Sequence, residues 1–221
     1  MSDLDSKVFV VDDDASFSRS IARWLRGHGY AVECYSSAED FLTRRPSHAQ
    51  ACVVADLDMP GMDGISMQEA LKRSSDPLPV VFLTGQGDIR ASVRAMRNGA
   101  EDFLEKTMGT DNLLAAIKRA LARDAKERAD SLRQRELFAR FAKLTSREKE
   151  VLAYMLCGLL NKQIGAHLDI SERTVKRYRA SLMPKLEVKS VVELAQITTK
   201  AGVDFEARTP GDILAQLEAC S

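Results

Sequence analysis

Residues 7–14 read KVFVVDDD, and this stretch decides the fold of the first half of the chain. The apolar run from Val8 to Val11 is typical of a strand buried on both faces of a parallel sheet. Three carboxylates follow it without a gap. Helical spacing of apolar residues from Ser16 to His28 predicts a helix directly after them.

The same alternation continues outward from this stretch. Four more short apolar runs predict strands, at 31–35, 51–55, 79–83 and 103–104. Helices are predicted from Ser37 to Leu42 and over 88–98. Strands that alternate with helices form a parallel sheet covered on both faces. The predicted fold class is therefore α/β, a doubly wound five-stranded parallel sheet, and in such sheets ligands bind beyond the carboxyl ends of the strands.

The second half is predicted to be helical throughout. No Pro or Gly interrupts residues 110–157, and residues 122–136 are charged on nearly every side, which is typical of a solvated helical linker. A capping box at Thr145 and caps at Asn161, Ser171 and Ser190 predict four helices beyond it. The predicted division is 1–122, an α/β domain; 123–142, a helical linker; 143–202, an all-α domain; and 203–221, an acidic tail. A short helix in that tail, from Pro210 to Leu217, is expected to be a frayed appendage.

The formal net charge is zero, with 32 basic and 32 acidic side chains. This total excludes a uniformly basic nucleic-acid binder and an acidic disordered chain. The charges are unevenly spread, however. Residues 1–122 hold 14 basic and 18 acidic side chains, and residues 143–202 hold 11 and 6. The excess of five positive charges in the second block indicates a nucleic acid or another anionic partner.

Targeting and metal-thiolate signals are missing from the sequence. No apolar run follows a basic cluster at the start, and no stretch approaches 18 consecutive apolar residues. The four cysteines form no CxxC pair, and the three histidines are scattered. These observations favour a cytoplasmic protein with reduced thiols and no contact with a membrane.

Polar residues stand at the carboxyl ends of four predicted strands. Asp12 and Asp13 follow the first strand, Asp56 the third and Thr84 the fourth, and Lys106 comes after the fifth. Clustered carboxylates repel one another unless a cation is present, and oxygen ligands of this kind suit Mg²⁺. A lysine and a hydroxyl suit the oxygens of a phosphoryl group, which a carboxylate can itself accept as a nucleophile.

This set, with Asp56-Leu57-Asp58-Met59-Pro60-Gly61 around the central carboxylate, resembles the receiver domain of two-component response regulators, a flavodoxin-like fold. The resemblance implies that Asp56 is the phospho-acceptor, with Thr84 and Lys106 contacting the phosphoryl group. It implies that Asp13, Asp56 and the carbonyl of Asp58 bind Mg²⁺, with Asp12 acting mainly through water. Phe103 stands where the family has its switch aromatic residue.

One position departs from that pattern. Receivers usually have proline after the lysine, often with a cis peptide bond, and this chain has Thr107. A cis bond before a non-proline residue costs about 2.5–4 kcal/mol. We therefore expect either a trans bond with a displaced Lys106 loop or a strained cis bond, and an altered activation of the site.

The basic block carries a helix-turn-helix pattern from Asn161 to Leu186, with basic residues in the first turns of its second helix. The segment from Leu144 to Ile197 resembles the four-helix DNA-binding domain of the LuxR/FixJ class. That resemblance implies that Lys176, Arg177 and Ala180 face bases and that Thr174 and Lys185 lie near phosphates. Arg173 and Arg179 complete the candidate DNA-binding set, since arginine can read guanine or neutralise phosphate. Tyr178 replaces the usual histidine. The last helix, from Val191 to Ala201, is a candidate dimer contact.

The sequence thus indicates a DNA-binding response regulator, not an enzyme, that accepts a phosphoryl group from a sensor histidine kinase. Its expected partners are double-stranded promoter DNA, a second copy of the chain after phosphorylation, and RNA polymerase. One alternative is a receiver that is no longer phosphorylated and binds DNA constitutively. The other is an aspartyl-phosphate phosphatase of the haloacid-dehalogenase type, because Asp56-Leu57-Asp58 matches its DxD motif. In that class the DxD motif lies on the first strand. Here the motif follows the third predicted strand, and the acidic pair Asp12-Asp13 precedes it in the sequence.

Overall fold

The computed structural model describes residues 6–47, 50–85, 89–107, 109–202 and 209–219. The chain divides into two compact units, Met1–Arg128 and Ala129–Ser221. Each unit is described by itself. Within the described ranges, no helix combines the length and the apolar character that crossing a bilayer requires.

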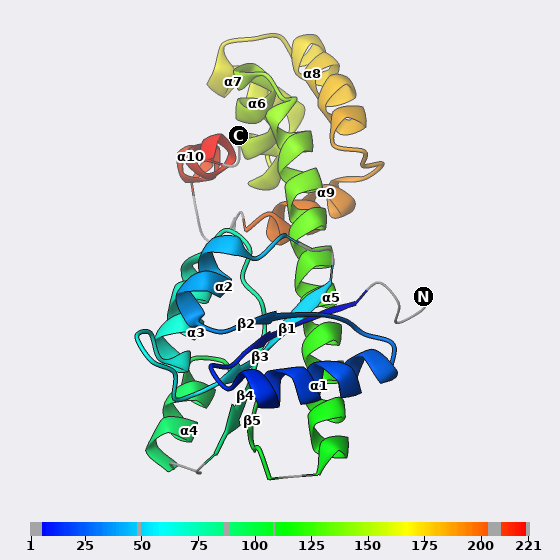
Figure 1. Cartoon of the computed structure of the whole chain (residues 1–221). Helices are drawn as coiled ribbons and strands as arrows, with labels where there is room; N and C mark the ends of the chain where they lie inside the picture. Colours follow the sequence, from blue (N-terminus) through cyan, green and yellow to red (C-terminus); the bar gives the residue numbers. More distant parts are fainter. Residues whose placement is uncertain (1–5, 48–49, 86–88, 108, 203–208, 220–221) are drawn as a thin grey trace. The chain divides into compact units, whose positions relative to one another are not determined.

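The first unit is a five-stranded sheet in which every neighbouring pair of strands is parallel, as predicted (Figure 1). The strand order is β2-β1-β3-β4-β5. The elements are β1 (Lys7–Val11), α1 (Ala15–Gly27), β2 (Ala31–Tyr35), α2 (Ala38–Arg44), β3 (Ala51–Asp56), α3 (Gly64–Arg73), β4 (Val80–Thr84), α4 (Ile89–Arg97), β5 (Asp102–Glu105) and α5 (Thr110–Ala142).

Alternation along the strands builds an apolar core on each face of the sheet. Val8 and Val10 of β1 point to the face that α1 and α5 cover, and Phe9 points to the face that α2, α3 and α4 cover. All six residues of β3 are buried. Because the central strands are covered on both sides, their carboxyl ends are held rigidly, and the loops that follow them are positioned with little freedom.

Helix α3 has no counterpart among the predicted elements. The segment that leads into it, with Pro60, Gly61 and Gly64, reads as an extended turn. In the structure Asp63 is its N-cap, with Oδ1 accepting from the Ser66 amide at 2.7 Å. Gly64 is its first residue, where a Cβ would overlap the carbonyl oxygen of Asp56. The glycine that reads as a turn signal therefore serves a close approach of the helix to β3.

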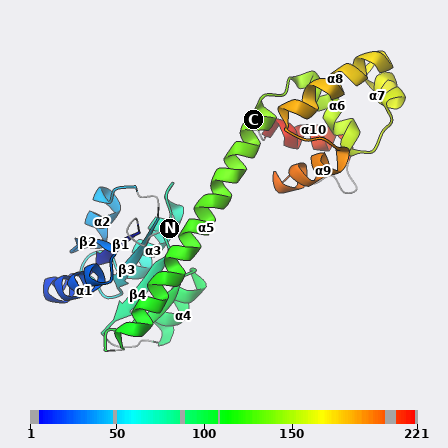
Figure 2. The same cartoon turned by 90° about the vertical axis from the view of Figure 1, so that its right-hand side faces the viewer.

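Helix α5 is one uninterrupted helix of 33 residues (Figure 2). Its helical character is as predicted, but the expected solvation of residues 122–136 is wrong at Asp124, which is only 2% exposed. Phe141, one of the apolar residues that follow the charged stretch, is 0% exposed. Asp124 is buried in the first unit by polar contacts, and Phe141 is buried in the apolar core of the second unit.

The second unit contains, after the end of α5, helices α6 (Ser146–Leu156), α7 (Asn161–Leu168), α8 (Glu172–Lys185), α9 (Val191–Lys200) and α10 (Pro210–Ala219). The predicted caps at Thr145, Ser171 and Ser190 are present. Asn161, predicted as a cap, is instead the first residue of α7. The cap position is Leu160, whose amide donates to Gln163 Oε1 at 2.8 Å.

The tail helix α10 is packed, so the expectation of a frayed appendage is wrong. Ile213 and Leu217 are fully buried and belong to the same apolar core as Leu152 and Val151 of α6. Their spacing of four residues places both on one face of α10, which is enough to dock a helix of ten residues.

Candidate functional site

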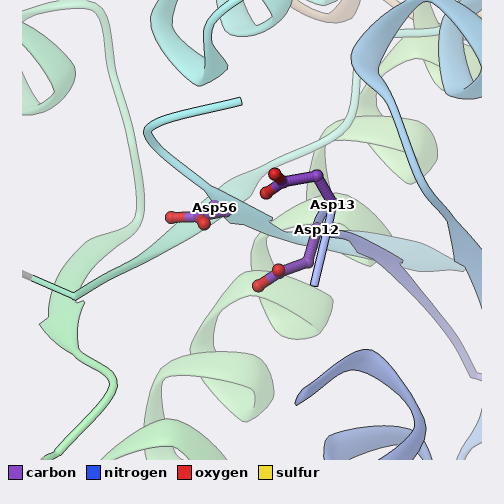
Figure 3. A group of neighbouring side chains, drawn as sticks. All are labelled: Asp12, Asp13 and Asp56. Carbon is purple, nitrogen blue, oxygen red and sulfur yellow. The ribbon is translucent and has the colours of Figure 1, made fainter. Parts of the chain in front are cut away.

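Three carboxylates meet at the carboxyl ends of β1 and β3. Asp12 and Asp13 directly follow β1, and Asp56 is the last residue of β3 (Figure 3). One carboxylate oxygen of each lies within 4.8 Å of one from each of the others. Neighbouring strands of a parallel sheet end side by side, which is why residues 43 positions apart in sequence share one pocket.

Lys106 joins this group from the loop after β5. Its Nζ lies 2.7 Å from Asp12 Oδ2 and 2.8 Å from Asp56 Oδ2, and 4.5 Å from the centre of the Phe17 ring. The lysine therefore neutralises one of the three negative charges. The remaining two suit a divalent cation, and the donor set of oxygens with one exposed member, Asp13, is typical of Mg²⁺ sites that keep water ligands.

Burial and the hydrogen bonds to charged partners act against each other on the pKa values of Asp12 and Lys106, and both pKa values end up raised. Burial raises the pKa of Asp12 above its ordinary value, against the lowering effect of its hydrogen bonds to Lys106 and to the Asp14 amide. Burial alone would lower the pKa of Lys106, but the hydrogen bonds to Asp12 and Asp56 outweigh it, and its pKa is raised. The lysine is therefore a permanent cation, while the buried Asp12 carboxylate is incompletely compensated.

The acidic residues near this pocket do not all share one role. Asp14 is the N-cap of α1, with Oδ1 accepting from the amides of Ser16 at 2.8 Å and Phe17 at 3.1 Å. The Asp58 side chain is exposed, two residues after β3. Asp56 itself accepts from the Leu57 amide at 2.7 Å, which turns its carboxylate toward the pocket side of the strand end.

Thr84 and the Lys106 loop complete the strand-end group. Thr84 is fully buried at the end of β4, and its carbonyl accepts from the Lys106 amide at 2.8 Å. The Lys106–Thr107 peptide bond is trans, since the described residues contain no cis bond. Of the two expected outcomes for Thr107, the trans bond is thus the one observed. Lys106 nevertheless reaches both Asp12 and Asp56.

Phe103 lies on β5, partly buried against the core under α4. Its ring centre is 6.3 Å from that of Phe82 on β4, with the ring planes tilted by 49°. The aromatic side chain therefore connects the edge strand β5 to β4, the strand that lies between β5 and the Asp56 strand β3.

In the second unit, α7, a short turn and α8 form a helix-turn-helix. Asp169 at the turn is left-handed, with φ of 52°, and the Ile170 amide donates to the Gly165 carbonyl at 2.9 Å. A Cβ on Gly165 would lie 2.7 Å from the Ile170 carbonyl oxygen. The turn therefore packs so closely on α7 that only glycine fits at this position.

The predicted DNA-binding residues separate into two groups. Arg173, Lys176, Arg177 and Ala180 are exposed on α8, with Lys176 Nζ paired to Glu172 at 2.9 Å within the helix. Thr174, half-buried, shares a hydrogen bond of 2.8 Å with the Ser171 hydroxyl. Except for Ala180, which follows shortly after, this first group lies along the amino-terminal half of α8, the part that enters a major groove in this motif.

Arg179 and Lys185 form the second group, because their charged ends bind within the domain. Arg179 Nη1 donates to Asn161 Oδ1 at 2.9 Å, which ties α8 to the start of α7. Lys185 Nζ donates to both carboxylate oxygens of Glu148, at 2.8 and 2.7 Å. The partners Asn161 and Glu148 are not among the predicted site residues. Asn161 is predicted only as a helix cap, Glu148 belongs to the capping box that begins at Thr145, and no sequence signal links either residue to α8.

Glu148 is the centre of a buried polar cluster. It is 3% exposed and accepts from Lys185, from the Ser181 hydroxyl at 2.7 Å and from the Thr145 amide at 2.8 Å. Burial alone would raise the pKa of Glu148, but these hydrogen bonds lower it to about 2. The carboxylate that caps α6 therefore also anchors the end of α8.

Comparison with known proteins relates the two halves of the chain to two different families. Residues 8–118 match the family described as response regulator receiver domain, and residues 142–198 match the luxR family of bacterial regulatory proteins. The chain is similar to the response regulator protein TodT of Pseudomonas putida, with 38% identity over 200 residues that cover 90% of this chain and 88% of TodT. It is 37% identical over 196 residues to the transcriptional regulatory protein FixJ of Bradyrhizobium diazoefficiens, covering 89% of this chain and 96% of FixJ.

Solved structures give the same result. A structure of the response regulator StyR superimposes with a TM-score of 0.80 and 42% identity, covering 89% of this chain and 99% of StyR. Full-length FixJ from B. japonicum gives a TM-score of 0.54 with 37% identity, over 89% of this chain and 97% of FixJ. With an acidic pocket at the strand ends of the first unit, a helix-turn-helix in the second and relatives that span both, the chain belongs to the two-component response regulators with a LuxR-family DNA-binding domain.

Proposed function

We propose that Asp56 accepts a phosphoryl group from a sensor histidine kinase and that this modification controls binding of α8 to promoter DNA. The observation that supports it most directly is the meeting of Asp12, Asp13 and Asp56 around Lys106 at the strand ends. Burying carboxylates costs folding free energy unless cations or hydrogen bonds compensate their charge, so a cluster of this kind is more typical of a functional site than of a purely structural one.

In the proposed reaction, a carboxylate oxygen of Asp56 attacks the phosphorus of the donor. The bond from phosphorus to the donor's leaving group breaks, and that group departs with the electron pair. An acyl phosphate forms on Asp56. The Lys106 ammonium, now 2.8 Å from Asp56, would pair with the new phosphoryl oxygens, and the Thr84 hydroxyl would donate to one of them.

Asp13, Asp56 and the carbonyl of Asp58 would hold Mg²⁺, with Asp12 acting mainly through water. When bound, the ion neutralises the charge that develops on the phosphoryl oxygens. Two negative charges remain in the pocket after Lys106 is counted, and this excess supports a divalent cation there. Phe103 would respond to the Thr84 contact and change the face formed by α4 and β5.

For DNA, the proposed contacts on α8 are Lys176, Arg177 and Ala180 toward bases, with Arg173 beside them and Thr174 near a phosphate. Arg179 and Lys185 are bound to Asn161 and Glu148, so a phosphate near either one would share it with these partners or replace them. Phosphorylation would favour a homodimer, for which Val191 and Val192 of α9 offer exposed apolar side chains, 41% and 68% exposed. Contact with RNA polymerase would follow at the promoter.

Incubation with a small phosphodonor and Mg²⁺, followed by intact-mass measurement, tests the acceptor. The wild-type chain should gain one phosphoryl group and Asp56→Asn none. Asp58→Asn is the matched control, because it changes a neighbouring carboxylate but keeps the backbone carbonyl, so it should still be modified. An unmodified wild type would favour the constitutive DNA binder, and an equal gain in Asp56→Asn would refute the assignment.

Replacement of Thr107 by proline tests the departure from the family pattern. We expect the rate of phosphorylation or the lifetime of the acyl phosphate to change, because the lysine loop is rebuilt. If both stay the same, Thr107 has no part in the altered activation that we propose.

A further inference from the structure

A cluster of polar side chains, here called the clasp, joins the middle of α5, residues 121–128, to the amino-terminal edge of the sheet. Neither the phosphoryl pocket nor the DNA-binding helix uses it. The clasp consists of Arg45, Gln50, Asp76, Asp124 and Arg128, all within the first unit.

The inner half of the clasp holds α5 to the start of β3. Asp124 Oδ2 accepts from the Ala51 amide at 3.0 Å and from Arg128 Nε at 2.9 Å. Gln50 Nε2 donates to the Leu121 carbonyl at 3.2 Å. Asp124 is 2% exposed, so its carboxylate is almost fully removed from water. A buried carboxylate of this kind is retained only where its partners are kept in place.

The outer half connects α5 to two further elements. Arg128 Nη2 binds Asp76 Oδ1 at 2.7 Å, in the loop after α3. Arg45, directly after α2, binds the other oxygen of Asp76 at 3.2 Å and also donates to the Asp76 carbonyl. The planar guanidinium of Arg128 therefore bridges two carboxylates, a geometry that lysine cannot reproduce.

Polar contacts attach residues 122–128, in the middle of α5, to the rest of the first unit. Among the described residues, Leu121 is the last α5 side chain in the apolar core of the first unit. Residues 122–128 lie beyond it and are held by the clasp, together with a bond from Arg123 to the Gly99 carbonyl at 3.2 Å. A charged helical segment without tertiary contacts has little stability of its own.

The position of the clasp relates it to the phosphoryl pocket. Ala51 is the first residue of β3 and Asp56 the last, so the two ends of the strand are roughly 16 Å apart at 3.3 Å per residue. Helix α5 follows the carboxyl end of β5 and runs back toward the amino ends of the strands, as connections in parallel sheets do. The clasp thus stands where the helix leaves the sheet, at the edge opposite to the pocket.

We propose that Asp76, Asp124 and Arg128 are positioning residues for control by phosphorylation: they keep residues 121–128 of α5 attached to the sheet of the receiver, so that a change at Asp56 reaches the linker. This inference rests on the proposed function. Without the clasp, residues 122–128 bend or fray relative to the sheet, and the linker no longer follows the state of the pocket. Loss of the clasp does not change the acceptance of the phosphoryl group by Asp56, which lies at the carboxyl ends of the strands.

Arg128→Gln and Asp124→Asn in the full chain test this role, with Arg133→Gln as the matched control. Arg133 lies on the same helix and its substitution removes the same charge. Among the described residues its ion pair is with Asp130 of the same helix, at 3.0 Å. The DNA probe is a duplex of about 30 base pairs, long enough for two half-sites one turn apart, selected from a random pool by the phosphorylated wild-type protein. Phosphoryl incorporation is followed by intact mass, and DNA affinity is measured with and without the phosphodonor, well below the unfolding temperature.

We expect phosphorylation to raise wild-type affinity by about 5–150-fold, the range of common allosteric couplings. The two clasp variants should incorporate phosphoryl as fast as wild type but show an affinity ratio near one, with faster hydrogen exchange of the amides in 121–130. Arg128→Lys should recover only part of the ratio, and Arg133→Gln all of it. A wild-type ratio in the clasp variants would overturn the inference while leaving the proposed function standing. A wild-type chain that gains no phosphoryl group would overturn both.

Discussion

Gly64 shows how one residue sets the distance between two elements beside the pocket. Its amide donates to the Leu57 carbonyl at 2.9 Å, and the place of a Cβ is taken by the Asp56 carbonyl and, at 2.9 Å, by Phe82. Because the clashing atoms include the backbone carbonyl of Asp56, a Cβ at this position could be accommodated only if α3 moved away from the end of β3.

Gly64→Ala should therefore destabilise the first unit by about 1–3 kcal/mol, the usual cost of overpacking, although alanine is the better helix former. It should also slow phosphoryl acceptance, because Asp56 shifts with its carbonyl. Chemical unfolding and the intact-mass time course measure the two effects. Gly27→Ala, where a Cβ would meet nothing within 4 Å, is the control. Equal stability of the two variants would contradict the steric account.

Leu160 is an unusual residue at a helix N-cap. It is 71% exposed, has the extended backbone of a cap and offers no side-chain oxygen. Leu160→Ser should stabilise the second unit by about 1 kcal/mol, because its hydroxyl can accept from the amide of Gln163 at the start of α7. Thermal unfolding measures the gain, and Leu160→Ala should show none. A loss of stability in the serine variant would mean that the exposed Leu160 side chain makes apolar contacts that stabilise the fold.

At the scale of elements, α6 and α8 are joined by the Glu148 cluster. The pKa of Glu148 is lowered in the folded state to about 2 from its ordinary 4.5. A carboxyl with a lowered folded pKa stabilises the fold above its unfolded pKa and loses that contribution as pH falls through the folded one. The contribution is thus complete above about pH 4.5 and is lost between there and about pH 2.

Glu148→Gln should destabilise the second unit by about 1–3 kcal/mol at neutral pH, since Lys185 and Ser181 lose an ionised partner. The difference from wild type should shrink as pH falls from 4.5 toward 2. Unfolding midpoints measured across this range check the sign. Glu150→Gln is the control, because Glu150 pairs with the exposed Arg147 on the outside of the same helix. A difference that stays constant down to pH 2 would rule out this linkage.

For the whole molecule, the neutral total of charge is the sum of an acidic receiver and a basic DNA-binding block. DNA binding by the full chain should therefore weaken steeply with salt, in proportion to the number of phosphates neutralised. Lys176→Ala and Arg177→Ala should each cost about 1–3 kcal/mol on the selected duplex and little on an unrelated one if they read bases. An equal loss on both duplexes, with a salt slope smaller by about one, would make them phosphate contacts.

Most of the fold followed from local patterns. Apolar runs mark all five strands within one residue at their ends, and Ser37, Thr145, Ser171 and Ser190 mark helix starts, because strand burial and capping depend on neighbours in sequence. The exceptions are informative. Gly64 and Leu160 lack the sequence sign of their role, and the burial of Asp124 and Ile213 depends on partners more than 50 residues away in sequence.

The sequence by itself determined the fold class, the order of the two domains and the residues at each strand end, since these depend on local periodicity and on the rule that parallel strands end together. Only the tertiary structure decided which charged residues turn inward. Arg179 and Lys185 have the same sequence character as Lys176 and Arg177, yet Asn161 and Glu148 bind the first two. Whether a charge meets water, DNA or a buried partner depends on which helices cross nearby, and that is settled by packing in three dimensions.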